Sequence, residues 1–232
     1  VMDYVPGDDL RTLMLKAKHQ GKYLKEAEVR KWANQLADAL IYLHDQNPPI
    51  LHRDIKPSNL KLTPSGLLKL VDFGLVKVLA PGEMTITIIQ GQGTALYTPL
   101  EQYGGDGAHT DIRSDIYSFG ATLYHLLTNT APADARERFI NPGSLVPPRQ
   151  INSAVSAQME RAILWAMNLH PDERPASMAQ LRDYFTGRTE YLDKTTPVEL
   201  KLTQILSFPE VKILLYISLG LMLVSLMGAF FI

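Results

Sequence analysis

The chain has 232 residues, carries a formal net charge of −1 at pH 7 and contains 20% charged residues. This length allows one or two domains with a sizeable core, and the balanced charge gives no basic field for a nucleic acid. Because there is no cysteine, disulfides, thiolate catalysis and cysteine-based zinc sites are excluded, and the six histidines show no HExxH spacing. The first residue is Val1 rather than Met and no signal peptide follows it, so we expect a part of a longer protein.

The first elements in chain order are a short strand, a turn and two helices. Val1–Val5 is apolar enough for a strand, and Pro6–Asp9 has the residue types of a turn. Leu10–Lys18 and Lys25–Gln46 are predicted to be helices, the second ending before two prolines. Its apolar residues recur every three or four positions and form one stripe: Val29, Trp32, Leu36, Leu40 and Leu43.

A loop of charged and polar residues follows, His52-Arg53-Asp54-Ile55-Lys56-Pro57-Ser58-Asn59. Asp72 lies 18 residues after Asp54, beyond a predicted strand. This grouping suits phosphoryl transfer, because one carboxylate can orient a hydroxyl nucleophile and accept its proton. The ammonium of Lys56 can neutralise a γ-phosphate, while the Asn59 amide oxygen and the Asp72 carboxylate can hold Mg²⁺. The alternative interpretation is a polar turn and a proline-started helix in some other α+β fold.

The remaining elements up to residue 186 are mostly helices. Leu60–Thr63 and Leu67–Val71 are predicted to pair as a hairpin. Ala131–Gln150 is rich in proline and is predicted to be a loop, whereas Val155–Asn168 is an amphipathic helix. A capping box at Ser177 and Gln180 starts the last helix, Ser177–Phe185. A central buried helix begins within residues 111–120 and carries the apolar stripe Ile116, Phe119, Leu123 and Leu127.

The C-terminal end differs in kind from the rest. Ile213–Ile232 is a run of 20 residues without a charge, long enough to span a bilayer as a helix; a buried core helix is the alternative. Lys201 and Lys212 precede it and place the rest of the chain in the cytoplasm by the positive-inside tendency. Ser225 and Ala229 form a pair of small residues that can pack two such helices, so a homodimer is one expected assembly.

The octapeptide at residues 52–59 resembles the catalytic loop of the protein kinase family, and Asp72-Phe73-Gly74 resembles its metal-binding motif. The match is closest to bacterial serine/threonine kinases of the eukaryotic type with a membrane helix after the kinase domain. It implies an α+β, predominantly α-helical fold over residues 1–186, a protein-kinase-like C-terminal lobe that starts at the interlobe hinge. A juxtamembrane linker over 187–210 and a single transmembrane helix over 211–232 are expected to follow. The Gly-rich loop, strand lysine and helix glutamate that precede the hinge in kinases do not occur in the chain, so the small lobe is missing.

The same resemblance implies the catalytic roles. Asp54 is the catalytic base or hydroxyl-orienting residue, Lys56 the phosphate-neutralising cation, and Asn59 and Asp72 are the Mg²⁺ ligands. Thr94 matches the family threonine whose hydroxyl bonds to the catalytic Asp and Lys. The implied cofactors are ATP and Mg²⁺, and the implied partner is a protein substrate with a serine or threonine hydroxyl.

Five positions are implied to lie at the nucleotide. The backbone of Asp3 and Val5 is expected to contact adenine, with Met2 at the gatekeeper position. Asp9 either contacts the ribose or is a solvated turn carboxylate. Lys61 departs from the family pattern, because most kinases place an apolar residue beneath adenine, although its alkyl stem can still cover the ring.

Two phosphorylation sites and their receiver are implied in the segment after Asp72. Arg53 is expected to receive an activation-loop phosphate, and Thr85 and Thr87 are its candidate carriers or else simple loop hydroxyls. Phe73 is expected to pack against the catalytic loop. Gly74 supplies the backbone freedom of its motif.

Two further contacts are implied to support the loop. Glu101 is expected to pair with Arg174, although Leu100 replaces the proline that the family places before this glutamate. Asp115 either accepts backbone N–H bonds from the catalytic loop or simply interacts with its own helix dipole. His52 is expected to be a packing residue.

Two functions remain open. The first is an active, membrane-anchored serine/threonine protein kinase, a single-pass protein of the cell membrane with its kinase lobe in the cytoplasm. The second is a catalytically inactive, pseudokinase-like binding or scaffold module, favoured by the missing small lobe and the departures at Lys61 and Leu100. For the 232-residue chain alone we expect little or no turnover, because half of the nucleotide cleft would face water.

Overall fold

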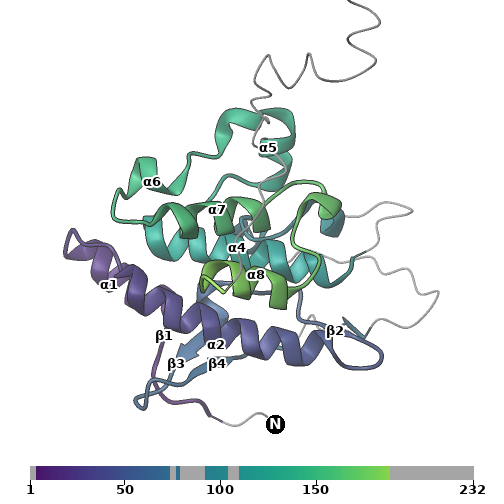
Figure 1. The fold of residues 1–232 in the computed structure, drawn as a ribbon. Coiled ribbons are helices and arrows are strands. Elements are labelled where there is room, and N and C mark those ends of the chain that lie inside the picture. Colours follow the sequence, from purple (N-terminus) through teal and green to yellow (C-terminus); the bar gives the residue numbers. More distant parts are fainter. Residues whose placement is uncertain (1–3, 74–76, 79–91, 104–109, 189–232) are drawn as a thin grey trace, which may run out of the picture. The chain divides into compact units, whose positions relative to one another are not determined.

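The computed structural model describes residues 4–73, 77–78, 92–103 and 110–188 (Figure 1). The chain divides into two compact units, Val1–Glu190 and Tyr191–Ile232, and all of the described residues belong to the first. Within the described ranges, no helix is both long and apolar enough to cross a bilayer. The expected transmembrane helix over 211–232 lies outside these ranges, and so does the expected linker over 187–210 except for its first two residues.

The first two helices follow the predicted bounds closely. α1 spans Leu10–His19 and begins at Asp9, whose carboxylate accepts a hydrogen bond from the Thr12 amide at 2.8 Å. α2 spans Glu26–His44 and packs against α8, α4 and β4. Its buried face consists of Val29, Ala33, Leu36, Ala37, Leu40 and His44. The predicted stripe was therefore rotated slightly, since Trp32 and Leu43 are only half-buried and two alanines take their place at the core.

A small antiparallel sheet contains β1 (Asp8–Asp9), β3 (Leu60–Leu62) and β4 (Leu68–Leu70), in the order β1-β3-β4. The β3–β4 hairpin is confirmed, with Lys61 opposite Lys69. The strand expected over Val1–Val5 is wrong for Tyr4 and Val5, which lie before β1 and outside any strand.

Strand pairing instead begins where the sequence predicted a turn. Gly7 has a φ of +109°, and a Cβ there would lie 2.0 Å from the Leu62 carbonyl oxygen, so only glycine allows this close approach. The chain consequently enters the sheet at Asp8, opposite Leu62. A second, two-stranded pair joins β2 (Ile50–Leu51) to β5 (Lys77–Val78) in antiparallel fashion.

The central helix α4 spans Ile112–Thr128 and is buried almost all round. Asp111 caps its first turn by accepting the Arg113 amide at 2.7 Å, and Asn129 ends it in the left-handed conformation with φ of 54°. At Gly120 a Cβ would lie 2.8 Å from the Ala166 Cβ, so α4 and α7 (Ala157–Ala166) approach closely there. The predicted stripe on α4 is buried, and so are the residues between its members, except for the half-buried His125.

The proline-rich stretch Ala131–Gln150 contains helices, so the predicted loop was wrong in part. α5 spans Ala135–Ile140 and α6 spans Pro148–Ile151. Asp134 caps α5 by accepting the Arg136 amide at 2.8 Å, and proline at the first position of α6 needs no hydrogen-bond partner for its nitrogen. Prolines therefore start a helix here rather than prevent one.

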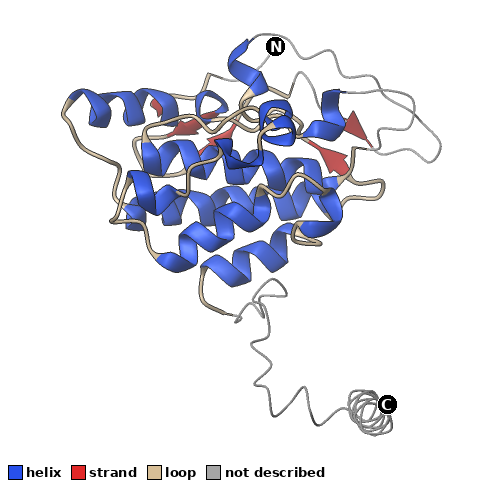
Figure 2. Ribbon diagram, turned by 90° about the horizontal axis from the view of Figure 1, so that it is seen from above, coloured by secondary structure: helices blue, strands red, loops and turns tan. Residues whose placement is uncertain are grey.

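The last described helix, α8, spans Met178–Phe185 and begins at Ser177, which accepts the Gln180 amide at 3.1 Å. Gln180 accepts in return from the Ala176 amide at 2.8 Å, one residue before the position that a capping box predicts. α2, α4, α7 and α8 pack on one another, and Figure 2 shows the short strands toward one side of these helices. The remaining described elements are the short helix α3 (Gln92–Ala95) and the 3-10 turns Pro57–Asn59, Leu100–Tyr103, Pro142–Ser144 and Pro171–Glu173.

Candidate active site

A fully buried carboxylate at the start of α4 holds the loop that follows β2. Asp115 accepts the His52 amide at 2.9 Å and the Arg53 amide at 2.8 Å, one on each carboxylate oxygen. These are the backbone bonds that the sequence predicted for it. Arg53 has a φ of 67°, so this charge also holds a left-handed turn in place.

Asp115 has a third partner that was not predicted from the sequence. His44, at the end of α2, lies 3.0 Å through Nε2 from the Asp115 carboxylate, and both side chains are buried. The signal was a histidine four residues after Leu40 on an apolar stripe, where a hydrocarbon side chain would be expected. His44 therefore ties α2 to the loop through α4.

Four side chains form what we call the catalytic cluster: Asp54, Lys56, Asn59 and Thr94. Asp54 is 7% exposed, and its Oδ2 accepts from Lys56 Nζ and from Asn59 Nδ2, each at 2.8 Å. Asn59 Nδ2 also donates to the Asp54 carbonyl at 2.9 Å. Lys56 Nζ donates further to Thr94 Oγ1 at 3.1 Å, which joins the loop to a residue 38 positions later.

The two carboxylate oxygens of Asp54 differ in their hydrogen bonds. Asp54 Oδ1 is buried and has no hydrogen-bond partner within the described ranges. A buried carboxylate oxygen without a donor carries a desolvation cost that an incoming hydroxyl would relieve. The cluster can therefore accept a hydroxyl proton at a fixed point, beside a positive charge.

Asn59 and Asp72 offer the oxygen ligands that Mg²⁺ prefers. Because both Asn59 amide hydrogens are used within the loop, its Oδ1 faces away from Asp54 and lies 3.4 Å from the Ser58 hydroxyl. Asp72 follows β4, is exposed, and has a left-handed φ of 67°. Among the residues with defined placement, no group of three or more His, Cys, Asp or Glu side chains gathers as a metal site. One amide and one carboxylate nevertheless fit Mg²⁺, which keeps several water or phosphate oxygens as ligands.

The structure describes some, but not all, of the residues that are expected to bind the nucleotide. Asp9 uses one carboxylate oxygen as the cap of α1, so the structural role of this residue is visible and a ribose contact would fall to the other oxygen. Lys61 lies in β3 with its Nζ 3.5 Å from the Gly7 carbonyl oxygen. Val5 is half-buried, and Asp3 lies outside the described residues.

Arg53 is a buried, positively charged residue with few hydrogen-bond partners. Its side chain is 6% exposed, and Nε and Nη2 have no hydrogen-bond partner in the part of the chain that the structure describes. Burial lowers the pKa of this guanidinium, and the nearby Asp115 opposes that shift. A buried guanidinium of this kind can bind an anion such as a phosphate. The candidate phosphosites Thr85 and Thr87 lie outside the described residues. Gly74 of the predicted metal-binding motif also lies outside them.

Two side-chain contacts stabilise the loop and the segment after Thr94. The His52 and Phe73 rings meet edge to face with centroids 5.0 Å apart, the packing expected for both. Arg174 donates to both Glu101 oxygens, at 2.6 and 3.0 Å, and the guanidinium is fully buried. The turn Leu100–Tyr103 forms without the family proline, so the leucine at position 100 leaves this ion pair intact.

A pocket of about 300 Å³ opens beside the catalytic cluster. Lys56 and Thr94 belong to both, so the pocket begins where the cluster ends. Most of the residues that line it were not among the predicted site residues. The lining residues are Arg11, Lys56, Ser58, Thr94, Leu96, Tyr97 and His125.

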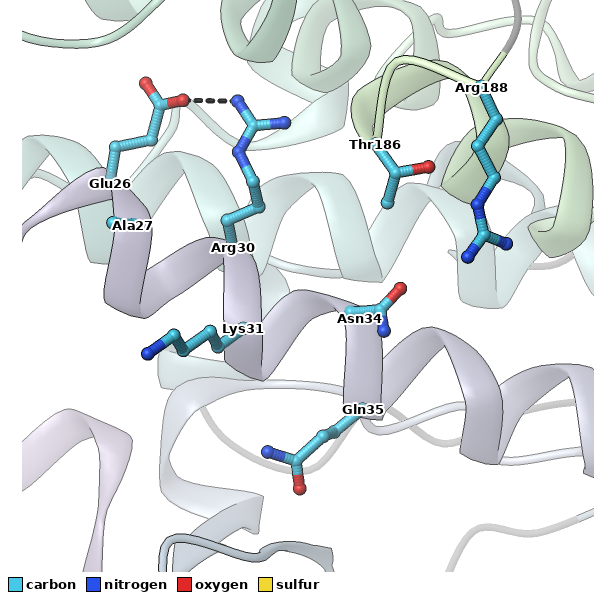
Figure 3. A pocket seen from close by; sticks show the side chains of 8 residues that line it. All are labelled: Glu26, Ala27, Arg30, Lys31, Asn34, Gln35, Thr186 and Arg188. Atoms are coloured by element: carbon cyan, nitrogen blue, oxygen red, sulfur yellow. Dashed lines mark hydrogen bonds and ion pairs between the residues drawn. The ribbon is translucent and has the colours of Figure 1, made fainter.

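A larger pocket, of about 720 Å³, lies between α2 and the end of α8 (Figure 3). It contains none of the catalytic cluster. Its Arg30 is engaged structurally, donating to Glu26 and to the Phe185 carbonyl. In Figure 3, Thr186 and Arg188 face α2 from the opposite wall. Its size alone does not make it the reaction site.

Comparison with known proteins gives one consistent match. The sequence model of the protein kinase domain matches residues 1–185. A probable serine/threonine-protein kinase of Clostridium acetobutylicum is 34% identical over 190 residues, which cover 79% of this chain and 27% of that protein. The serine/threonine-protein kinase PknB of Mycobacterium leprae is 28% identical over 188 residues, 78% of this chain and 29% of that protein.

The chain therefore spans less than a third of the length of these relatives. Among solved structures, the apo form of PpkA-294 has a similar fold, with a TM-score of 0.61 and 22% identity. That likeness covers 79% of this chain and 61% of the other. At 22% identity, this similarity supports a shared fold and nothing further.

Proposed function

The chain belongs to the protein kinase domain family, and from that premise we propose that it provides the catalytic lobe of a serine/threonine protein kinase. The reaction transfers the γ-phosphoryl group of MgATP to a serine or threonine hydroxyl of a protein. The observation that carries the proposal is the catalytic cluster, in which Asp54 is oriented by Lys56 and Asn59 while Oδ1 stays open.

Each member of the cluster has a task in this proposal. Asp54 Oδ1 accepts the hydrogen bond of the substrate hydroxyl and takes its proton as the new O–P bond forms, while the bond from the γ-phosphorus to the bridging oxygen breaks and ADP leaves. Lys56 contributes positive charge next to the reacting oxygen, and Thr94 holds the Lys56 ammonium in position. When bound, MgATP supplies the phosphoryl group, and Asn59 and Asp72 would hold the Mg²⁺.

The test is Asp54→Asn in the full-length protein that contains this chain, assayed by phosphate incorporation into a protein substrate. Asparagine keeps the size of the side chain but accepts no proton, so we expect incorporation to fall roughly 100- to 10,000-fold. Asp38→Asn is the matched control, because Asp38 is a surface carboxylate on α2 with a side chain 58% exposed. Unchanged incorporation by the Asp54 variant would overturn the assignment.

A second candidate function is a pseudokinase-like binding or scaffold module. Two observations favour it: Lys61 stands where an adenine-covering apolar residue is expected, and Asp9 already serves as a helix cap. Both lower the expected affinity for a nucleotide. This candidate predicts partner binding without phosphoryl transfer, and any transfer that depends on Asp54 would rule it out.

We propose further that residues 187–210 are a linker and that 211–232 form one membrane-spanning helix, with the catalytic lobe in the cytoplasm. The support is the uncharged run Ile213–Ile232 preceded by Lys201 and Lys212. The test is alkaline extraction of membranes from cells that express the full-length protein and a variant lacking 211–232. The proposal predicts that only the variant is released. A homodimer through Ser225 and Ala229 would follow from the same helix.

A further inference from the structure

The charged residues that line the pocket beside the catalytic cluster are all positive. Its lining includes two cations, Arg11 and Lys56, and none of the described residues that line it is acidic. The remaining polar groups are the hydroxyls of Ser58, Thr94 and Tyr97 and the His125 imidazole. Hydroxyl, ammonium and guanidinium groups are all hydrogen-bond donors, which is the set that an anion requires.

Arg11 is the cation that remains available. It is exposed near the start of α1 and makes no hydrogen bond or ion pair with any residue whose placement is described. Lys56 already contacts Asp54 and Thr94, and the neighbouring Lys18 donates to the Asn129 carbonyl at 3.0 Å. A guanidinium with all five donors unused can bind a carboxylate or phosphate with two parallel bonds.

Tyr97 and His125 complete the wall without changing its charge. Their rings stack with centroids 6.0 Å apart, and the Tyr97 hydroxyl lies 2.6 Å from His125 Nδ1. Burial lowers the pKa of His125 to about 4, with added repulsion from Lys18 and Arg11, and burial raises the pKa of Tyr97 to about 12. At neutral pH both groups are uncharged, so the pocket keeps the positive charge of its lysine and arginine.

We propose that this pocket selects protein substrates by binding an anionic side chain close to the acceptor serine or threonine, with Arg11 as its main recognition residue. This specificity rests on the proposed kinase function. The spacing follows from Lys56, which touches both the reacting carboxylate and the pocket. A pocket of this volume is roughly 7 Å across, and an extended peptide advances about 3.3 Å per residue, so the anion lies within about three residues of the acceptor.

The anion can be the carboxylate of Asp or Glu or the phosphate of a residue that is already phosphorylated. Both offer oxygen pairs to a guanidinium, and they differ in charge and in the number of oxygens. The experiment therefore uses three sets of serine peptides that carry Glu, phosphoserine or Gln at each position from three before to three after the acceptor.

Phosphorylation and binding are measured separately with the full-length protein. The ratio kcat/KM reports transfer to each peptide, and fluorescence anisotropy of labelled peptides reports binding without ATP. For wild type we expect kcat/KM and affinity about tenfold higher for the anionic peptide than for its Gln counterpart at one or two positions. Whether Glu or phosphoserine gives the larger increase identifies the source of the anion.

Arg11→Glu tests the assigned residue, and its exposure means that the fold should tolerate the change. We expect the preference to invert, with the anionic peptide about tenfold worse than Gln and a lysine peptide improved. Lys31→Glu on α2 is the matched control, since it makes the same change in net charge on an exposed helix face outside this pocket. The control should keep the wild-type preference.

The outcomes separate this proposal from the kinase function. Transfer to all peptides without an anionic preference, or a preference that survives Arg11→Glu, would overturn the pocket and leave the kinase function intact. Binding of anionic peptides that Arg11→Glu abolishes, without transfer to any peptide, would support the pocket and overturn the kinase function.

Discussion

The two sides of the candidate site are built in opposite ways. On the hydroxyl side, the catalytic cluster is held by side chains from α2, α4 and the loop between them, and Asp54 is 7% exposed. On the proposed nucleotide side, formed by β1, β3 and Asp72–Phe73, Phe73 is 48% exposed and the Lys61 ammonium lies 3.5 Å from the Gly7 carbonyl oxygen.

The difference shows that the side chains of the hydroxyl side are buried and held by hydrogen bonds, whereas those of the nucleotide side are more exposed. Preorganised groups need little rearrangement during a reaction, so the hydroxyl side is ready to orient a substrate. The nucleotide side offers ligands on an open surface. Substitutions on the first side should therefore reduce stability and activity together, whereas those on the second should change nucleotide affinity alone.

The largest effect on stability is expected for Arg174→Ala. The change leaves Glu101 nearly buried without its partner, and breaking such a pair costs about 3–5 kcal/mol of unfolding free energy. Urea denaturation measures it. Arg182→Ala is the control, because its pair with Asp38 is on the surface and should cost within about 1 kcal/mol. Equal losses in the two variants would contradict the contrast between buried and exposed regions.

Asp115→Asn should have the next largest effect. The amide can no longer accept two backbone N–H bonds and a histidine with a full charge, so we expect a loss of about 2–3 kcal/mol and a strong loss of phosphate incorporation. Denaturation and the incorporation assay measure the two effects. Asp172→Asn, an exposed carboxylate with a side chain 71% exposed, should leave both nearly unchanged. Activity that survives in Asp115→Asn would show that the loop holds its shape without this charge.

Acidic pH should weaken the hydroxyl side through its buried histidines. Burial lowers the pKa of His52, and it lowers that of His125 to about 4, below the value of about 6.5 of an unfolded histidine. Between these values the folded state binds fewer protons than the unfolded state, so stability is full above pH 6.5 and falls as the pH approaches 4.

For His125 alone the expected loss is about 2 kcal/mol, after allowing for its partial exposure. Urea midpoints measured at several pH values between 4 and 7 test it. His125→Gln removes the titrating group and should flatten that part of the profile. A variant with the wild-type slope would assign the acid sensitivity to other groups.

The smallest effect on stability is expected for Lys61→Met on the nucleotide side. We expect a change within about 0.5 kcal/mol, because the one hydrogen bond of this side chain to the described residues is long, at 3.5 Å. Nucleotide affinity should rise about threefold, since methionine covers a ring without a charge to hydrate. Titration with a fluorescent ATP analogue measures it. Lys69→Met, directly opposite on β4 and exposed, is the matched control and should leave affinity unchanged.

The elements predicted well were those with a local signal. The hairpin and the two long helices α2 and α4 show periodicity within their own sequence. The bounds predicted for the hairpin strands and for α2 agree with the structure to within a few residues. The strand at Asp8–Asp9 escaped prediction because it exists only through pairing with β3, 52 or more residues later. The helices within Ala131–Gln150 were not predicted because the prolines of this stretch were taken to indicate a loop, although proline is favourable at a helix start, as in α6.

The residues of the candidate site also divide into those that a local sequence motif predicted and those that no motif indicated. Asp54, Lys56, Asn59 and Asp72 lie in two short motifs, which is why a family resemblance could find them. His44, Arg11 and His125 belong to three different helices and to no motif. Only the folded chain brings Arg11 and His125 to one pocket, so no spacing rule could have indicated them.

The burial of α4 has a consequence for the time scale on which the protein opens. Its amides near Phe119 lie beneath α2 and α7, and the residues on either side of Phe119 are buried. Hydrogen exchange there should require unfolding of the entire unit, whereas exchange in β4 should proceed through local fraying. The slowest-exchanging amides of α4 would then report the global unfolding free energy directly, in native buffer and without denaturant.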